Sequence, residues 1–459
     1  MNPDLRRFVF CAPVLFAAIM LADAAPTAHA AETGRQLVLI TLDGFPAYLW
    51  RDQTIPLPNL RKLAAGGVVA NAMTIANPAI TWPNHTTLVT GVAPRKHGVL
   101  YNGLVTRQGP GQPTKTEQWA DKSRLVRVPT VYDAAFQAGL TTAEIDWVAI
   151  SNPGTITWSF AERPDPAGVL PREMVAAGVA TQAEIETNLK TNIVSRDEMW
   201  TRAACFVFAQ HHPNLLLYHL LNTDSTHHRY GPGSLASINA LALADRLVGE
   251  LVRTIDASGR RDQTTIIVTT DHGFKKVDHY IYPNVALKQA GLLHAAGAGL
   301  GQCDAYVGAQ GGIAFVYVTD PTRRADLLPK LRALFTPIEG VAQVLDGSEA
   351  PSLGMPTPAE NEAMGDLILY PKAGYAFTGS AAGDIVNGPS INYGGTHGYP
   401  ASDPELDGIF LAHGAGIKAG VKLDRVSNLD VAPTIARLLG VALPTADGHV
   451  MEQILTTAK

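Results

Sequence analysis

The sequence is poor in cysteine and in charge, and beyond its N-terminus it has no long apolar run. Three cysteines in 459 residues, none at the short spacing of a thiolate metal motif, indicate neither a disulfide scaffold nor a Cys-based metal site. No later stretch approaches the ~18 consecutive apolar residues of a membrane span. The net charge of -5 argues against electrostatic binding of nucleic-acid polymers.

Residues 1–30 have the pattern of a cleaved signal peptide. Arg6 and Arg7 precede an apolar stretch over residues 8–21, and small residues at 28–30 provide a cleavage point near Ala31, with Ala24 as an earlier site. A core helix at the start of the chain is the alternative. The pattern predicts an exported protein, periplasmic or secreted, whose mature catalytic domain spans residues 31–459.

Cys205 and Cys303 remain after removal of such a signal. An oxidising compartment would permit one disulfide between them, but two buried free thiols are the ordinary alternative.

Hydrophobic residues make up 46% of the whole chain, and the mature region alternates strand-like with helix-like segments. This order is typical of an α/β fold, with a mostly parallel central sheet covered by helices on both faces. Helical spacing over residues 238–255 precedes a strand at 264–270, and Asp430 is expected to cap a helix that ends at Gly440. Dense Gly, Ala and Pro at about 280–392 indicate a smaller inserted cap lobe.

Three aspartates stand just past apolar runs that read as buried strands. Asp43 follows residues 37–42, Asp224 follows 215–221 and Asp271 follows 266–270. Ligand sites of open α/β sheets lie beyond the carboxyl ends of the strands, so we expect these carboxylates at one edge.

Histidines accompany these aspartates: His272 directly follows Asp271, His228 lies four residues after Asp224, and His397 sits in a Gly-rich loop. Carboxylate and imidazole suit zinc and similar ions without any cysteine. Each residue alone could be a turn former, a helix cap or a core side chain. Together they would supply ligands for two ions that clamp the attacking and leaving oxygens of a phosphoryl transfer.

Thr81 is the candidate nucleophile, because it stands just before the helix-compatible stretch 86–90. A hydroxyl near a helix N-terminus and a metal ion is stabilised as the alkoxide. The alternative is that Thr81 only caps the helix.

Several motifs resemble the nucleotide pyrophosphatase/phosphodiesterases of the alkaline phosphatase superfamily. The resemblance covers nearly the whole mature chain in order, at residues 42–44, 81–85, 90–98, 224–232, 270–273, 396–399 and 428–434. It implies an alkaline phosphatase-like fold and hydrolysis through a phospho-threonine at Thr81.

The same resemblance implies two Zn²⁺ ions per chain. One would be held by Asp224, His228 and His397, and the other by Asp43, Asp271 and His272, with Thr81 on the second ion. Asn102 would donate to a phosphoryl oxygen, although Asn-Gly is also a common turn dipeptide.

The substrate is predicted to be a small phosphodiester or nucleotide. Residues 81–84 lack the sulfatase pattern, and residues 141–150 lack the cations that bind a phosphomonoester. Trp82 and Trp147 could stack on a nucleobase or simply pack in the core. A zinc phosphomonoesterase or phosphonate hydrolase on the same core is the alternative activity, and a non-catalytic binding protein is a third hypothesis.

The remaining histidines carry weaker signals. His85 and His97 flank the nucleophile segment as supports or, more simply, as structural residues. His227 would point away from His228 if that stretch were extended, so it is left out of the site, and His279 and His413 are unassigned.

Overall fold

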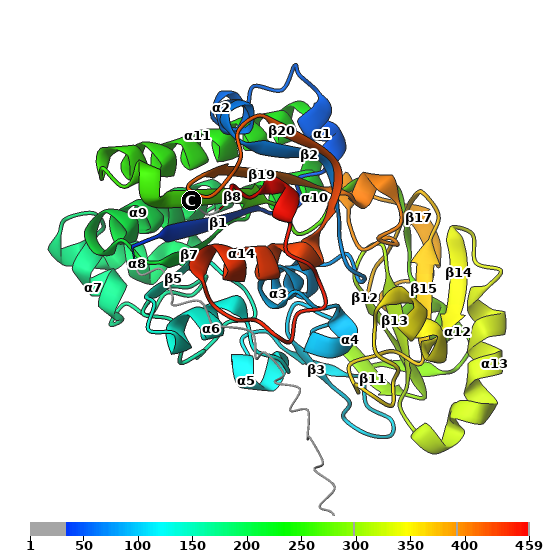
Figure 1. The fold of residues 1–459 in the computed structure, drawn as a ribbon. Helices are drawn as coiled ribbons and strands as arrows, with labels where there is room; N and C mark the ends of the chain where they lie inside the picture. Colours follow the sequence, from blue (N-terminus) through cyan, green and yellow to red (C-terminus); the bar gives the residue numbers. More distant parts are fainter. Residues whose placement is uncertain (1–33, 297–298, 392, 458–459) are drawn as a thin grey trace, which may run out of the picture.

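The fold is built on an eight-stranded, mostly parallel sheet (Figure 1). The computed structural model describes residues 34–296, 299–391 and 393–457, so the signal peptide prediction lies outside the described residues. The strand order is β20, β2, β19, β8, β1, β7, β5, β6. Of these, only β19 runs antiparallel to both of its neighbours, β2 and β8. The bounds are β1 Gln36–Leu42, β2 Val68–Thr74, β5 Thr142–Ile145, β6 Trp158–Phe160, β7 Leu215–Leu220, β8 Thr264–Thr269, β19 Gly408–Gly414 and β20 Val421–Ser427.

The central strands are buried on both faces, as their continuous apolar runs require. In β1, Val38 and Ile40 join one hydrophobic cluster, while Leu37 and Leu39 join the other. Alternate side chains of a strand point to opposite faces, so each residue contributes to one of two cores.

Helices cover both faces of this sheet (Figure 1). The first core lies under α2 Pro58–Gly66, α9 Ile193–His211 and α11 Leu235–Ala257. The second lies under α3 Thr81–Thr90, α6 Val131–Gln137 and α14 Val431–Leu439. The other helices described in this part of the chain are α1 Ala47–Arg51, α4 Pro94–His97, α5 Lys122–Leu125, α7 Val169–Ala176, α8 Gln182–Thr187 and α10 Asn222–Tyr230.

A smaller lobe stands beside the main sheet, at the right of Figure 1. Its antiparallel sheet has the order β12, β13, β15, β14, with bounds β12 Ala305–Ala309, β13 Ala314–Val318, β14 Val341–Asp346 and β15 Leu367–Pro371. Helices α12 Pro283–Gln289 and α13 Arg324–Phe335 pack on it. Tyr101 of the main body contacts the lobe, with its hydroxyl 2.7 Å from that of Tyr317.

Strand β9 Lys275–Ile281 connects the two parts. It pairs with β16 Gly374–Phe377, β17 Asn387–Pro389 and β18 Gly395–Thr396. Because β18 immediately precedes His397, this pairing returns that histidine to the end of β8. The remaining hairpins are β3 Leu104–Thr106 with β4 Lys115–Glu117, and β10 Leu293–Ala296 with β11 Gly299–Cys303.

The predictions for the C-terminal helix cap and for the two cysteines can be compared with the structure. The helix before Gly440 forms, but the Asp430 carboxylate accepts from the His449 backbone N–H at 2.8 Å and does not cap it. Cys205 and Cys303 are free thiols, in α9 and β11 respectively. Within the described ranges, no helix is both long and apolar enough to cross a membrane.

Candidate metal centre and nucleophile

The three aspartates meet because their strands are neighbours in the sheet. Asp43 directly follows β1, Asp271 lies just past β8, and Asp224 lies in the first turn of α10 after β7. Strands β8 and β7 flank β1 and run parallel to it, so their carboxyl ends share one edge. His228 lies one helical turn after Asp224 on α10.

Two groups of three side chains form at this edge, each with its ligand atoms within 4.8 Å of one another. In the first, His272 Nε2 lies 3.5 Å from Asp43 Oδ1 and 3.1 Å from Asp271 Oδ2. In the second, Asp224 Oδ1 lies 3.5 Å from His228 Nε2 and 3.6 Å from His397 Nε2. The structure thus brings together all six residues predicted as metal ligands.

Each imidazole is oriented by a backbone carbonyl. His228 Nδ1 donates to Gly395 O at 3.1 Å, His272 Nδ1 to Gly273 O at 3.1 Å, and His397 Nδ1 to Ala79 O at 2.8 Å. A carbonyl oxygen can only accept, so Nδ1 carries the proton and Nε2 presents a lone pair to the site. A hydrogen bond from Nδ1 to a carbonyl is the usual support of a histidine that binds metal through Nε2.

The carboxylates have complementary free oxygens. Among the described residues, Asp43 Oδ1, Asp224 Oδ1 and Asp271 Oδ2 are buried and lack a hydrogen-bond partner. The same atoms make the short approaches to the imidazole Nε2 atoms. Buried anionic oxygens without partners are costly, and a cation is the partner that such a donor set fits.

The electrostatics agree with this fit. Burial, together with Asp271 and Asp224, raises the pKa of Asp43 well above its usual value. Burial also raises the pKa of Asp224 to about 6 and lowers the pKa of His272 to about 3. Burial and the neighbouring His272 lower the pKa of His397 well below its usual value. These imidazoles are therefore neutral at neutral pH, the form that binds metal.

Thr81 is the first residue of α3, and Ile80 occupies the N-cap position. The predicted helix therefore starts earlier than residue 86, and Thr81 does not cap it. Its hydroxyl instead lies 3.4 Å from His272 Nε2. This hydroxyl therefore lies beside the group of Asp43, Asp271 and His272, called the Asp43 group below, and at the positive N-terminal end of α3.

Asn84, which the sequence did not single out, holds the loop that leads to Thr81. Its amide nitrogen donates to the carbonyls of Ala76, Pro78 and Ile80 at 3.0–3.2 Å. Its Oδ1 accepts from Asn428 Nδ2 at 2.8 Å, which ties α3 to the segment before α14. In the sequence, the signal for this contact was the Asn-Leu-Asp motif at residues 428–430, which contains Asn428.

Asn102 approaches the same site from a loop. Its Oδ1 accepts the backbone N–H of Trp82 at 3.0 Å, so its amide NH₂ is left to face outward. Asn102, Thr81, Asp224, His228 and His397 all line a cavity of about 300 Å³. Sequence reasoning had left a plain turn as the alternative for Asn102.

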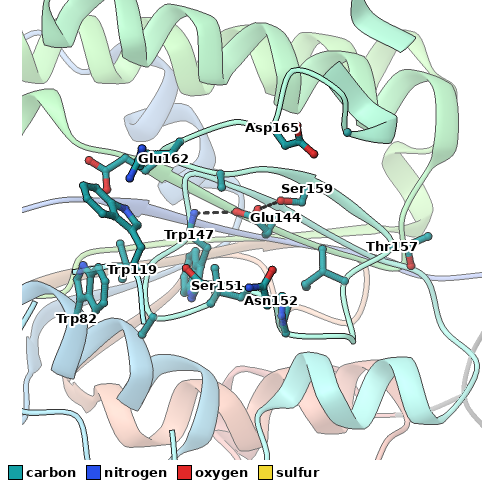
Figure 2. Close-up of a pocket in the computed structure, with 18 of the residues that line it drawn as sticks. Trp82, Trp119, Glu144, Trp147, Ser151, Asn152, Thr157, Ser159, Glu162 and Asp165 are labelled. Atoms are coloured by element: carbon teal, nitrogen blue, oxygen red, sulfur yellow. Dashed lines mark hydrogen bonds between the residues drawn. The ribbon is translucent and has the colours of Figure 1, made fainter. Parts of the chain in front are cut away.

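A second cavity of about 550 Å³ borders the first and shares Trp82, Trp119, Val148 and Glu162 with it. Figure 2 shows Trp82 and Trp119 at one end of this second cavity and Thr157 at the other. Trp119, another residue that the sequence reasoning missed, is 41% exposed. Trp147 also lines this second cavity, but it is only 3% exposed and packs edge-on against His85 with ring centroids 4.9 Å apart, so little of its ring is open for stacking.

The other histidines have structural surroundings. His85 Nδ1 donates to Thr81 O, His97 lies against Thr87, and burial lowers the pKa of both to about 3. His227 lies on α10 and not on an extended stretch; its Nδ1 donates to Gly44 O at 3.0 Å, and it belongs to neither ligand group. His279 stacks on Tyr375, and His413 contacts Arg261, away from both ligand groups.

Comparison with known proteins identifies this fold and its family. The human structure of ectonucleotide pyrophosphatase/phosphodiesterase 5 superposes with a TM-score of 0.70 at 17% identity, covering 92% of this chain and 100% of that one. The fold is thus an alkaline phosphatase-like α/β fold. A model of the type I phosphodiesterase / nucleotide pyrophosphatase family matches residues 37–400, and the chain belongs to that family of enzymes.

Curated relatives agree with this assignment. The chain is 26% identical over 449 residues to Homo sapiens ectonucleotide pyrophosphatase/phosphodiesterase family member 7, covering 95% of this chain and 87% of the relative. It is 24% identical over 437 residues to the venom phosphodiesterase of Macrovipera lebetinus, covering 88% of this chain and 43% of the relative. The family resemblance inferred from the motifs is confirmed.

Proposed function

We propose that this protein is an exported two-zinc hydrolase that cleaves phosphodiester or pyrophosphate bonds of small molecules through a phospho-threonine intermediate. The observation that carries the proposal is a helix-terminal hydroxyl, that of Thr81, which lies next to one Asp/His group and lines one cavity with the other. The family supports the reaction class. The zinc ions, the phospho-threonine intermediate and the export of the protein are the parts of the proposal that go beyond this reaction class.

Asp43, Asp271 and His272 would hold one zinc ion, and Asp224, His228 and His397 the other. When bound, the two ions would supply positive charge for the attacking and leaving oxygens of an in-line displacement. The unpartnered carboxylate oxygens and the outward Nε2 lone pairs support this ligand set.

Thr81 provides the covalent step. Its Oγ gives up its proton to solvent and attacks phosphorus, forming an Oγ–P bond while the bond from phosphorus to the leaving oxygen breaks and that oxygen takes up a proton in return. Water then attacks phosphorus, the Oγ–P bond breaks and the Thr81 hydroxyl is restored. The position of Thr81 at the start of α3 favours the alkoxide, because the first N–H groups of a helix stabilise negative charge.

Asn102 would steady the phosphoryl group. The Trp82 N–H fixes its Oδ1, which leaves two N–H donors for a non-bridging oxygen. Donors placed where charge develops contribute to transition-state stabilisation.

The cavity favours a diester over a monoester. Among the described residues that line the 300 Å³ cavity there is no lysine or arginine, while Asp146, Glu162 and Asp224 are present. A phosphomonoester carries more negative charge than a diester, and this lining offers no side-chain cation to bind the additional charge. Trp82 and Trp119 provide aromatic area for the substituents of a nucleotide or another small diester. A related fold, murine ectonucleotide pyrophosphatase/phosphodiesterase 5, is described as a complex with AMP.

Replacement of the nucleophile tests the mechanism. Thr81→Ala is expected to lose about 10⁴-fold or more in turnover while keeping both zinc ions, because only the attacking oxygen is removed. Thr81→Ser, which keeps a hydroxyl, is the matched control and should retain measurable turnover. Full activity of the alanine variant would refute the Thr81 assignment.

Substrate preference tests the reaction class. The zinc-loaded protein should hydrolyse a nitrophenyl ester of thymidine monophosphate faster than nitrophenyl phosphate. A strong preference for the monoester would establish the phosphomonoesterase alternative, and preference for a phosphonate monoester would establish the phosphonate hydrolase. Absence of both metal and hydrolysis would indicate a binding protein.

Export is tested separately. Expression of the full chain in a bacterium should yield a periplasmic or secreted product whose N-terminus starts near Ala31. An intact N-terminus in the cytoplasm would contradict the signal peptide.

A further inference from the structure

His219 is a buried residue that lies beneath the Asp43 group without belonging to either ligand group. It is on β7, paired in register with Thr41 of β1. Two residues after Thr41 comes Asp43, so the imidazole lies at the base of the site. No sequence pattern singles out this residue, because one histidine within an apolar run resembles a core side chain.

Both ring nitrogens of His219 face oxygen acceptors. Nε2 lies 3.0 Å from Asp43 Oδ2. Nδ1 lies 2.9 Å from the backbone oxygen of Asp146 and 3.1 Å from its carboxylate Oδ2. The ring therefore bridges the backbone and side chain of Asp146 to the carboxylate of Asp43.

This bridge gives the two oxygens of Asp43 different environments. Oδ2 accepts from His219, whereas Oδ1 has no hydrogen-bond partner among the described residues and lies 3.5 Å from His272 Nε2. A carboxylate held by one oxygen cannot rotate freely. The contact with His219 consequently directs Oδ1, and not Oδ2, towards the other ligands of its group.

Asp146 is itself held in place. It directly follows β5, whose last residue Ile145 pairs with Tyr218, so Asp146 lies beside His219. Its φ of +58° is in the left-handed region, which non-glycine residues adopt only where the surroundings impose it. Its N–H donates to Phe160 O at 3.0 Å, and its carbonyl and carboxylate both face Nδ1 of His219.

We propose that His219 is a positioning residue for the Asp43 metal site: anchored by Asp146, it fixes the Asp43 carboxylate so that Oδ1 alone faces the ion. This inference rests on the proposed function, in that it takes the Asp43 group to bind a metal. Hydrogen-bond partners of metal ligands orient them and contribute to metal affinity. Here the partner is a histidine acting on an aspartate.

Two substitutions separate the nitrogens of the ring. In His219→Gln the side-chain amide reaches the position of Nε2 and can still donate to Asp43. In His219→Asn the amide reaches only the position of Nδ1 and can contact Asp146 but not Asp43. The zinc retained per chain is measured by elemental analysis after equilibration with graded chelator, with thermal unfolding followed in parallel.

We expect His219→Asn to bind zinc at one site about 10- to 100-fold more weakly than the wild type. His219→Gln should recover most of that affinity. Zinc retention by His219→Asn equal to that of the wild type would overturn the proposal. Equal weakening in the Gln and Asn variants would also overturn it, because a purely structural histidine does not distinguish the two amides.

Asp245→Asn is the matched control for loss of a buried polar contact. The Asp245 carboxylate accepts from the backbone N–H groups of Asn59 and Leu60 at the start of α2 and contacts neither ligand group. The Asp245→Asn variant should have a lower unfolding temperature than the wild type but keep both zinc ions. Zinc loss in this control as large as in His219→Asn would overturn the proposal, because destabilisation alone would then explain the effect.

Two further results keep the test decisive. Should His219→Asn not fold, His219→Leu carries the same expectation of weaker zinc binding, because it removes the donor to Asp43 Oδ2, and unchanged binding would overturn the proposal. A wild-type chain that binds no zinc would refute the proposed function itself. A wild type with two ions and an unaffected His219→Asn would refute only the role of His219.

Discussion

The two ligand groups share the same chemistry but differ in depth. The side chains of Asp43, Asp271 and His272 are 0% exposed, whereas those of Asp224, His228 and His397 are 12%, 24% and 10% exposed. The first group lies on the sheet and is supported by it; the second borders the cavity. Water can replace a lost ligand in the second group more readily than in the first. The group of Asp43, Asp271 and His272, the inner group, is therefore the more rigid of the two and the less tolerant of substitution.

The largest effect should come from removing one ligand of each group. Asp271→Asn is expected to lose about 10⁴-fold in turnover, since its group lies next to Thr81 and has no water access. His228→Asn should lose about 10²-fold, because water can occupy the position of this imidazole, which is 24% exposed. Turnover of a nitrophenyl diester at excess zinc measures both, and equal losses would remove the distinction between the groups.

A smaller loss should follow replacement of Asn102, which lies on the cavity side. Asn102→Ala is expected to lower kcat about 10²- to 10³-fold with little change in KM, because the amide serves the charged transition state. Asn102→Asp is the matched comparison: it keeps the size, but its second oxygen repels the phosphoryl group. A large rise in KM at constant kcat would instead show that Asn102 binds the ground state.

Removal of metal should make stability depend on pH. The pKa values of Asp43 and Asp224 are raised by burial, that of Asp224 to about 6. A carboxyl whose pKa is raised by folding stabilises the fold in its protonated form, and this stability is lost as pH rises through the folded pKa. The unfolding free energy of the zinc-free protein, and its unfolding temperature with it, should therefore fall between about pH 4 and pH 7, by about 3 kcal/mol for Asp224. Saturating zinc should abolish this fall, and a fall that persists with zinc would contradict the assignment.

The smallest effect is expected furthest from the inner group. Trp119→Ala should raise KM about fivefold for an aromatic diester, from the loss of ~1 kcal/mol of aromatic contact, and leave kcat almost unchanged. Arg163 lies over this ring at 4.6 Å, so Arg163→Ala provides a control for rearrangement of the loop. An unchanged KM would exclude Trp119 from substrate binding.

Much of the fold was predictable from local patterns. The continuous apolar runs at β1, β7 and β8 indicated buried parallel strands, and the helical period of α11 appeared over residues 238–255. Boundaries were less accurate. Helix α3 starts at Thr81 because the loop before it is held by Asn84, a contact that local propensity does not encode.

The candidate site divides in a similar way. Asp43, Asp224 and Asp271 were predictable because an aspartate after a buried strand marks the carboxyl edge of the sheet. Trp147 was ambiguous, since an aromatic residue near a strand end can face either core or cavity, and only its packing on His85 shows that it is buried.

The sequence by itself determined the residue types of the site, the strands that carry them and the family, because these depend on local order and on motifs. Only the tertiary structure decided which oxygen of Asp43 is free, how each imidazole is oriented and how deeply each ligand group is buried. The bridge from Asp146 through His219 to Asp43 joins three strands, β5, β7 and β1, that are distant in the chain. Such contacts depend on strand order and register, which are set by the packing of the whole sheet.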